Sequence, residues 1–237
     1  SAPSWMGRMV AVEQGGFYGQ IDGADRIIGG AGKGGILNAR ILWTFSAAYR
    51  VQPDSAYLHM AERAYGYALK YFFDEEMGGT YWLVNADGSP ADTKKQIYSQ
   101  AFFIYALTEY HMASGNEEAL AKAKELFHLI EQHSRDTQVG GYFEAYSRDW
   151  QLLDDLRLSE KDENEKKTMN THLHILEAYT NLYRVWKDPR LKEALEALIL
   201  IFADHIIDTR KGHMNLFFDE QWTRKGTIGS YGHDIEA

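Results

Sequence analysis

The sequence predicts an all-α fold, an (α/α)6 barrel or toroid with short β-hairpins between helix pairs, as one domain over residues 1–237. Three observations predict it: a Gly-Gly motif recurs at a nearly constant interval, two helical stretches follow each copy, and the first helix of each pair is far more apolar than the second. A toroid commonly has six pairs, so we expect the C-terminal helices to be missing. A solenoid, or a small domain ending at Ala237, are the alternatives.

The Gly-Gly motif is followed by aromatic and β-prone residues, which indicates a strand and a turn in each copy. The copies are GGFYGQIDG from Gly15, GGTYWLVNADG from Gly78, GGYFEAYSRDW from Gly140 and a degraded HMNLFFDEQW from His213, with starts 63, 62 and 73 residues apart. Within the second copy, residues 85–88 (Asn-Ala-Asp-Gly) form a plausible hairpin turn.

Helical stretches lie between the copies and are divided by turn signals at Pro53, 114–116 and 188–189. A partial opening helix precedes them, and SYGHDIEA at the end resembles the start of another inner helix. The first helix of each pair is apolar nearly all round and should be buried on every side, whereas the second should keep one wet face. We expect the three pairs over 34–51 with 54–73, 94–113 with 116–134, and 166–187 with 189–207.

Composition and charge exclude several classes of function. The formal net charge of −9 argues against nucleic acid or an anionic membrane as partner, and no apolar run is long enough to span a bilayer. The chain has no cysteine, which removes thiolate chemistry and accords with a cytoplasmic location. Aromatic residues make up 14% of the chain, which suits either a sugar-stacking site or an aromatic core.

Polar residues in apolar surroundings near the ends of the inner helices are the candidate site residues. Arg40, within ILNARILW, needs a partner, and we expect either an electrostatic clamp for a developing oxyanion or a structural salt bridge. Tyr98 starts the second inner helix and is either a site or a core residue. Asn170 and His174 are four residues apart and share a helix face. His172 lies on another face, so the His-x-His pair should not chelate zinc.

His233 and Glu236 in SYGHDIEA are three residues apart, so a carboxylate could orient an imidazole if this segment is helical. The alternative is a helix start whose acidic residues favour the helix dipole. Phosphate-binding and nucleophile-elbow motifs are absent from the sequence. Paired acids for glycoside hydrolysis lack an apolar context at the conceivable positions, which are Glu144, Asp154, Asp155 and Asp234.

The chain resembles the N-acylglucosamine 2-epimerase superfamily, most closely its cellobiose-epimerising branch. The resemblance covers nearly the whole chain and depends on KGGILNARILWTFSAAYR, QIYSQAFFIYAL, KTMNTHLHILEAYTNLYRVW, LFFDEQW and SYGHDIEA. It implies an (α/α)6 barrel and an isomerase without cofactor or metal. The implied reaction is epimerisation at C2 of the reducing-end glucose of β-1,4-linked disaccharides, through ring opening and an enediolate. The alternatives are a monosaccharide aldose–ketose isomerase, an N-acetylglucosamine 2-epimerase, a toroid glycoside hydrolase or lyase, or a non-catalytic sugar-binding module.

The resemblance also implies roles for the candidate residues. His233, His174 and Arg40 would be catalytic, with His233 as one acid/base and its counterpart in the missing C-terminal part. The residues that would bind or orient a disaccharide such as cellobiose or lactose are Tyr98, Asn170, Glu236 and Trp43. We expect the complete protein to be a monomer, with the missing half supplied as a further segment or a separate chain.

Overall fold

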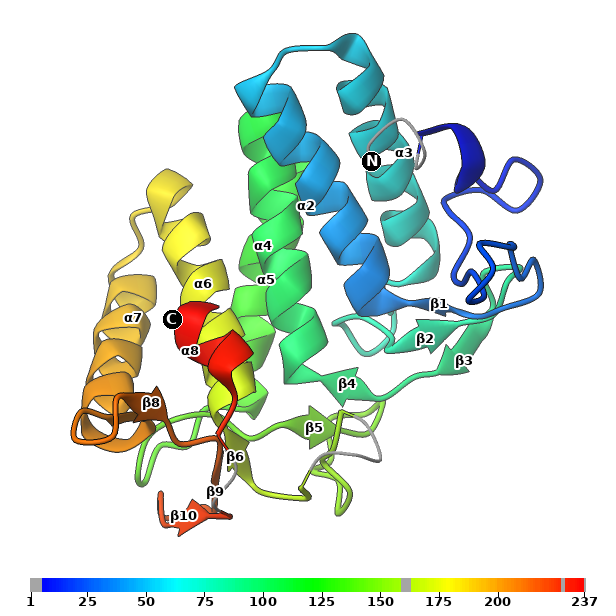
Figure 1. Cartoon of the computed structure of the whole chain (residues 1–237). Coiled ribbons are helices and arrows are strands. Elements are labelled where there is room, and N and C mark those ends of the chain that lie inside the picture. The colour runs from blue at the N-terminus through cyan, green and yellow to red at the C-terminus, as the bar shows by residue number, and fades with distance from the viewer. Residues whose placement is uncertain (1–5, 159–162, 227–228, 237) are drawn as a thin grey trace.

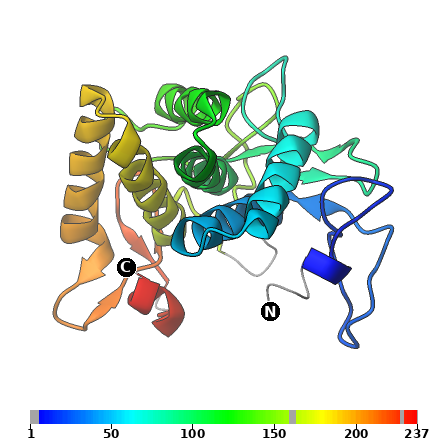
Figure 2. The ribbon, with the colours of Figure 1, turned by 90° about the horizontal axis from the view of Figure 1, so that it is seen from above.

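Three antiparallel helix pairs dominate the computed structural model, which describes residues 6–158, 163–226 and 229–236 (Figure 1). Helices α2, α4 and α6 stand side by side, with α5 on one side of this row and the short helix α8 (Tyr231–Glu236) on the other (Figure 2). The pairs are α2 (Gly35–Val51) with α3 (Ser55–Tyr71), α4 (Ile97–Ser114) with α5 (Glu117–His133), and α6 (Met169–Val185) with α7 (Pro189–Ile201). The predicted pairs are therefore confirmed.

The helix boundaries follow from local capping. The side chains of Asp54, Asn116 and Asp188 accept hydrogen bonds from the first backbone N–H groups of α3, α5 and α7. Gly115 ends α4 with φ 74°, a left-handed conformation that glycine adopts without a steric penalty. Pro189 occupies the first turn of α7, where its missing N–H costs nothing.

Short antiparallel strands join the pairs. The two-residue strand before each inner helix pairs with the hairpin that follows the outer helix of the same pair, so the two ends of each helix pair are held together. The three sheets of this kind combine β1 (Lys33–Gly34), β2 (Leu83–Val84) and β3 (Pro90–Asp92); β4 (Lys95–Gln96) and β5 (Ala145–Tyr146); and β6 (Lys167–Thr168), β9 (Phe217–Phe218) and β10 (Arg224–Lys225). The remaining sheet pairs β7 (Ile207–Asp208) with β8 (His213–Met214).

We call the contacts where a hairpin meets the inner helices the junctions, and they repeat along the chain. Lys95 and Lys167 are fully buried and form ion pairs with Asp74 and Asp136, at 2.9 and 2.8 Å. Lys33 lies at the equivalent place and donates to the Gly15 carbonyl instead, at 2.9 Å. These lysines are buried with partners, as burial of a charge requires.

The fourth residue of α4 and the fourth residue of α6 each accept a hydrogen bond from the backbone of a neighbouring hairpin. Gln100 accepts from Thr80 N–H at 2.8 Å, and His172 accepts from Tyr142 N–H at 3.0 Å. In α8, Asp234 accepts from Met214 N–H at 2.8 Å. The segment SYGHDIEA therefore begins as α4 and α6 do, and its helix α8 confirms the predicted helical start.

The fourth Gly-Gly copy begins one residue earlier than the sequence indicated. Gly212 donates to Asp208 O at 2.8 Å, as Gly140 does to Asp136 O at 3.1 Å. Gly212 and Gly140 also share positive φ values of 68° and 79°. The motif was obscured because His213 occupies the place of the second glycine.

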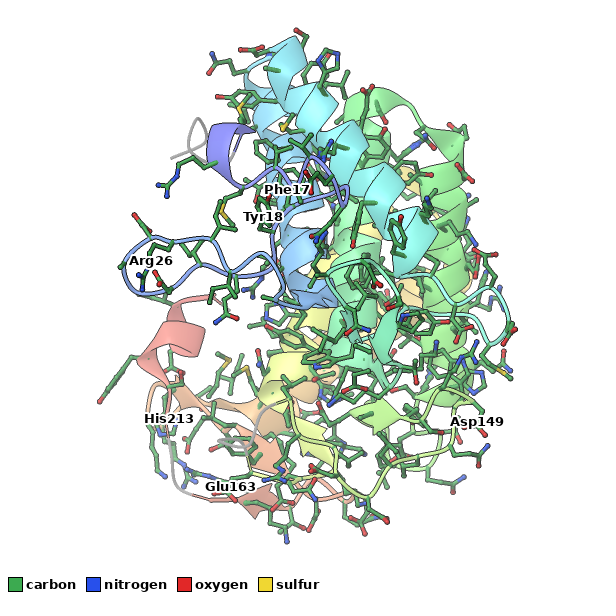
Figure 3. All side chains as sticks on the ribbon, turned by 90° about the vertical axis from the view of Figure 1, so that its right-hand side faces the viewer. Phe17, Tyr18, Arg26, Asp149, Glu163 and His213 are labelled. Carbon is green, nitrogen blue, oxygen red and sulfur yellow. The ribbon has the colours of Figure 1, made fainter. Side chains whose placement is uncertain are left out.

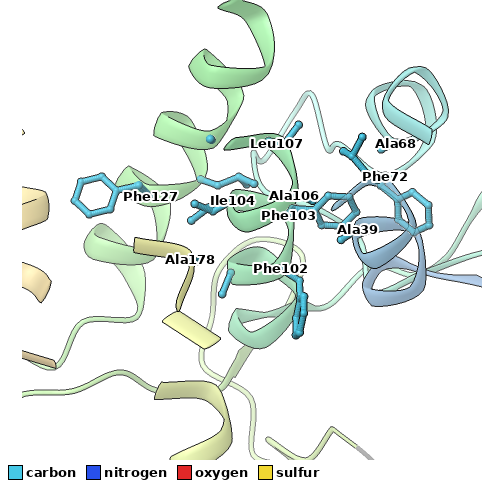
Figure 4. Close-up of a cluster of buried hydrophobic side chains, with 14 of the residues drawn as sticks. Ala39, Ala68, Phe72, Phe102, Phe103, Ile104, Ala106, Leu107, Phe127 and Ala178 are labelled. Carbon is cyan, nitrogen blue, oxygen red and sulfur yellow. The ribbon is translucent and has the colours of Figure 1, made fainter. Parts of the chain in front are cut away.

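The core fills the space between the inner helices and their partners, with Phe72, Phe103, Ile104 and Phe127 among its buried side chains (Figure 4). Helix α4 is buried along almost its whole length, as predicted. Helix α2 is not, because Arg40 and Thr44 are exposed on one of its faces. Helix α6 likewise exposes Thr180 and Arg184, so the prediction that every inner helix is buried all round is wrong for α2 and for α6. The polar connecting segments lie away from this core, as Figure 3 shows for Arg26 and Asp149.

Two further predictions concern the ends. The helix predicted to reach residue 207 ends at Ile201 and continues as a π-helix, Phe202–Ile206, closed by Ile207 N–H bonded to Phe202 O. The expected opening helix falls partly on residues 1–5, which lie outside the described residues. None of the helices described is long and apolar enough to cross a membrane.

Candidate functional site

A pocket of about 370 Å³ opens on the exposed face of α2, between α2, α4 and α6. Its lining combines one guanidinium, one imidazole and one carboxylate with three aromatic rings. The residues that line it are Arg40, Trp43, Thr44, Phe102, Tyr105, His174 and Glu177.

The lining residues form two rows at equal depth. Arg40, Phe102 and His174 each lie five residues after the first residue of their helix, and we call them the upper row. Trp43, Tyr105 and Glu177 each lie eight residues after it and form the lower row. Because the three helices start at equivalent junctions, equal positions along them lie side by side.

Arg40 reaches across to the neighbouring helix. Its Nη2 donates to the Tyr98 hydroxyl at 3.3 Å, and its guanidinium lies 4.6 Å from the centroid of the Phe102 ring. The sequence context suggested a buried arginine, but the side chain is exposed. None of the ion pairs found within the described ranges involves Arg40, so the structural salt bridge considered for it does not form there.

His174 is buried at the other end of the upper row. Its ring meets Tyr98 edge to face at 4.8 Å and Phe102 at 4.5 Å. Its Nδ1 lies 3.0 Å from Oε2 of Glu177. Tyr98 and Phe102 therefore bridge Arg40 and His174, and the three predicted residues Arg40, Tyr98 and His174 form one cluster.

Trp43 contributes an aromatic wall to the lower row. It stacks on Tyr105 with ring centroids 5.2 Å apart. Burial and the nearby Glu177 carboxylate raise the pKa of Tyr105 above its usual value, so its hydroxyl stays protonated near neutral pH. A neutral phenol and an indole face are suited to contact with the faces and hydroxyls of a sugar.

A second pocket, of about 480 Å³, shares His174 and Glu177 with the first and extends between α6 and α7. Its other lining residues are apolar and include Phe202 and Ile199. The His174–Glu177 pair thus separates a polar and aromatic pocket from an apolar one.

Asn170 does not join the cluster, although it shares a helix face with His174. As the second residue of α6 it lies one turn nearer the junction, in a separate cavity of about 70 Å³ with Glu144, Arg157 and Glu165. Glu144 accepts hydrogen bonds from Thr168 N–H, at 2.7 Å, and from the Thr171 hydroxyl. The four-residue spacing of Asn170 and His174 correctly places them on one face of α6. It also separates them by one helical turn, so they line different cavities.

His233 and Glu236 lie in α8, but their side chains are outside the described part of the chain. The helical backbone over Tyr231–Glu236 meets the condition under which the two residues share a face.

His172 is a structural residue. Its Nδ1 lies 2.7 Å from Thr168 O and its Nε2 accepts from Tyr142 N–H, so both nitrogens are engaged. Complete burial lowers its pKa to about 4. The imidazole is therefore neutral and held away from His174, which agrees with the rejection of a shared zinc ion.

Two carboxylates considered for glycoside hydrolysis also have structural partners. Asp155 forms an ion pair with Arg157 at 2.8 Å, which lowers its pKa to about 2. Asp234 bonds the Met214 backbone. A general acid needs a raised pKa, so Asp155 is unsuited to that role.

Sequence reasoning missed Phe102, Tyr105 and Glu177. Aromatic residues in an apolar helix resemble ordinary core residues, and Glu177 resembles a surface acid. Their common signal is positional, because they occupy the same places in α4 and α6 as Arg40 and Trp43 do in α2. Aligning the three inner helices from their first residues would have found them.

Comparisons with known proteins give one consistent result. A model of the N-acylglucosamine 2-epimerase (GlcNAc 2-epimerase) family matches residues 16–237. The chain is 56% identical to the cellobiose 2-epimerase of Bacteroides fragilis over 235 residues, covering 99% of the chain and 60% of that protein. It is 41% identical to a cellobiose 2-epimerase of Ruminococcus albus, covering 95% of the chain and 57% of that protein.

A solved structure extends the likeness to three dimensions. The cellobiose 2-epimerase of Bacillus thermoamylovorans superposes with a TM-score of 0.95 at 44% identity, over 98% of this chain and 60% of that one. The chain therefore spans about 60% of the length of the relatives that it matches.

Proposed function

Since this chain belongs to the N-acylglucosamine 2-epimerase family, we propose that it carries part of the active site of a cellobiose 2-epimerase. Such an enzyme inverts C2 of the reducing-end glucose of a β-1,4-linked disaccharide, so that cellobiose becomes glucosyl-mannose and lactose becomes epilactose. The observation that carries the proposal is the upper row, where a guanidinium and an imidazole flank one aromatic ring at 4.6 and 4.5 Å.

The chemistry requires both groups. After ring opening, the C2 proton lies next to an aldehyde and is only weakly acidic, so its removal needs stabilisation of the enediolate charge. Arg40 is a permanent cation in an open pocket and supplies that stabilisation. His174 assists at O1 or O2 of the sugar, and Tyr98 holds the guanidinium through its hydroxyl.

Inversion at C2 needs a proton-transferring group on each face of the intermediate. We assign one of these roles to His233, oriented by Glu236, and the other to a residue beyond this chain. Trp43 stacks against the sugar and Asn170 binds it from the junction side. Imidazole suits the exchange because it gives and takes a proton near neutral pH.

We further propose that the three helix pairs are part of an (α/α)6 toroid completed by further helices, in the same protein or a separate chain. The apolar pocket between α6 and α7, whose lining residues Ile199 and Ile207 are exposed, is a surface that such helices would cover. The greater length of the relatives supports this. The complete enzyme is expected to be a cytoplasmic monomer that binds neither nucleic acid nor membrane.

The decisive experiment incubates the complete protein with lactose in D2O, after dialysis against a chelator. Epilactose carrying deuterium at C2 supports proton exchange through an enediolate without a bound metal. Epilactose that consistently lacks deuterium contradicts that route, and absence of any epimer contradicts the proposed function.

A matched pair of variants tests the assignment of the acid/base. His233→Asn should abolish turnover, whereas Asp155→Asn should leave it unchanged, because Asp155 pairs with the side chain and the backbone N–H of Arg157 and lies outside the pocket lining. The opposite result would favour a carboxylate mechanism, as in a glycoside hydrolase or lyase.

A further inference from the structure

Glu177 is the carboxylate in the lining of the 370 Å³ pocket, and it joins the lower row to His174 of the upper row. Its Oε2 lies 3.0 Å from Nδ1 of His174, one turn back along α6. The imidazole is 8% exposed and the carboxylate 39% exposed, so the pair lies at the pocket wall. A carboxylate only accepts hydrogen bonds, so Nδ1 of His174 must be the donor.

The carboxylate is also engaged from the other side. Tyr105 is close enough to Glu177 for the negative charge to raise the pKa of its phenol, after the larger effect of burial. Tyr105 is in turn stacked on Trp43 at 5.2 Å. The carboxylate of Glu177 thus lies between the stacked rings of the lower row and the His174 ring of the upper row, which it contacts at 3.0 Å.

This contact decides which nitrogen of His174 is available. A neutral imidazole carries one proton, and a partner that accepts at Nδ1 selects the Nδ1–H form. Nε2 then keeps its lone pair and can accept from, or once protonated donate to, an oxygen in the pocket. Without the carboxylate, the ring could turn or carry its proton on Nε2.

We propose that Glu177 is a positioning residue that holds His174 as the Nδ1–H tautomer and thereby makes Nε2 the nitrogen that serves the sugar oxygens. The part that concerns catalysis depends on the proposed function. The part that concerns the tautomer does not, so the two can fail separately.

The tautomer is measured by 15N NMR of the imidazole in alkaline solution, where imidazole is generally neutral. The native protein should show His174 as Nδ1–H. Glu177→Ala and Glu177→Ser should shift it towards Nε2–H, whereas Glu177→Gln, which still offers a carbonyl acceptor, should retain it. An Nε2–H signal in the native protein, or an unchanged signal in both truncated variants, overturns the proposal.

Glu125→Gln is the matched control. Glu125 forms a pair of the same spacing with Lys122, at 3.0 Å, but on the outer helix α5. It should alter neither the His174 signal nor turnover.

Activity of the complete protein gives the second readout. Glu177→Ala should lower kcat by about 10- to 100-fold with KM within about 3-fold, because the ring is mispositioned rather than the sugar unbound. Glu177→Gln should recover most of that loss. Equal kcat in Glu177→Ala and native protein overturns the catalytic part. A native protein without epimerase activity instead contradicts the proposed function, and the NMR result still decides the tautomer.

Discussion

The junctions and the pocket wall follow the same repeat but use it in opposite ways. At the junctions, equivalent positions carry the same residue type: Lys95 and Lys167 each form an ion pair with an aspartate, and Lys33 donates to a backbone carbonyl. On the wall, equivalent positions carry different chemistry, because the upper row is Arg40, Phe102 and His174. The comparison indicates that the junctions set the register of the inner helices, and that this register places unlike side chains at one depth.

The sharpest test of the junctions removes a buried charge. Lys167→Met leaves Asp136 ionised without its partner at 2.8 Å and should destabilise the protein by about 3–5 kcal/mol, measured by urea unfolding. Lys211→Met is the control, since Lys211 meets Asp208, the counterpart of Asp136, at 3.8 Å on the surface. Its effect should stay within about 0.5 kcal/mol. Equal losses of unfolding free energy in the two variants would mean that the buried ion pair of the junction does not contribute specially to stability.

The corresponding test of the wall removes its cation. Arg40→Ala should reduce kcat/KM on cellobiose by about 10²- to 10³-fold, as expected for loss of oxyanion stabilisation. The melting temperature should hardly change, because the side chain is exposed. Arg26→Ala, on an outer turn, is the control for loss of one surface charge. If Arg40→Ala instead lowered the melting temperature strongly and left turnover intact, the pocket wall would serve stability rather than catalysis, which contradicts the assignment.

A finer test compares two neighbouring glycines. Both have positive φ, but a Cβ on Gly141 would lie 2.4 Å from Trp222, whereas one on Gly140 would meet only Ile201 at 3.8 Å. Both Gly→Ala variants should lose about 1–2 kcal/mol from backbone strain, and Gly141→Ala about 1–3 kcal/mol more from the clash. Chemical denaturation measures the difference, and equal losses would contradict the close packing at this junction.

A further test of the junctions concerns pH. The pKa of His172 is about 4 when folded and about 6.5 when unfolded, so the unfolded chain binds the proton more readily. Stability is complete above pH ~6.5 and falls towards pH ~4, by up to about 1.4 kcal/mol per unit. His172→Gln supplies the acceptor that Gln100 supplies at the equivalent place, and should flatten this slope. Unfolding midpoints measured against pH test it; parallel slopes would contradict it.

The aspartate of the junction, Asp136, titrates at a lower pH than His172. Hydrogen bonds with Lys167 and with backbone groups lower the pKa of Asp136 despite its burial. Its contribution is therefore lost only as the pH falls below the ordinary aspartate value of about 3.9. The two titrations can thus be separated in one experiment.

The helix pairs were predictable because their signals are local. Caps such as Asp54 and Asp188 and the left-handed Gly115 act through neighbouring backbone groups. The exposure of Arg40 was not predictable, since the residues that follow it directly, Ile41 and Leu42, are both buried.

The site was predictable only where one residue type was distinctive. Arg40, Tyr98 and His174 were singled out and lie together, whereas Asn170 was assigned by face and lies at another depth. Glu177 and Tyr105 acquire meaning only from their positions across helices, which periodicity along one helix does not reveal.

The indoles at two of the hairpin tips, those of Trp150 and Trp222, have a consequence for how such a chain can be cut and recombined. Trp150 donates to Met77 O and packs over Gly79, and Trp222 donates to Gly140 O and packs over Gly141. Each ring therefore closes the unit before its own. A module suitable for grafting therefore extends from one glycine pair to the tryptophan of the following hairpin. A graft that ended at the helix termini would lose the hydrogen bond from the indole N–H to the backbone carbonyl at the glycine turn.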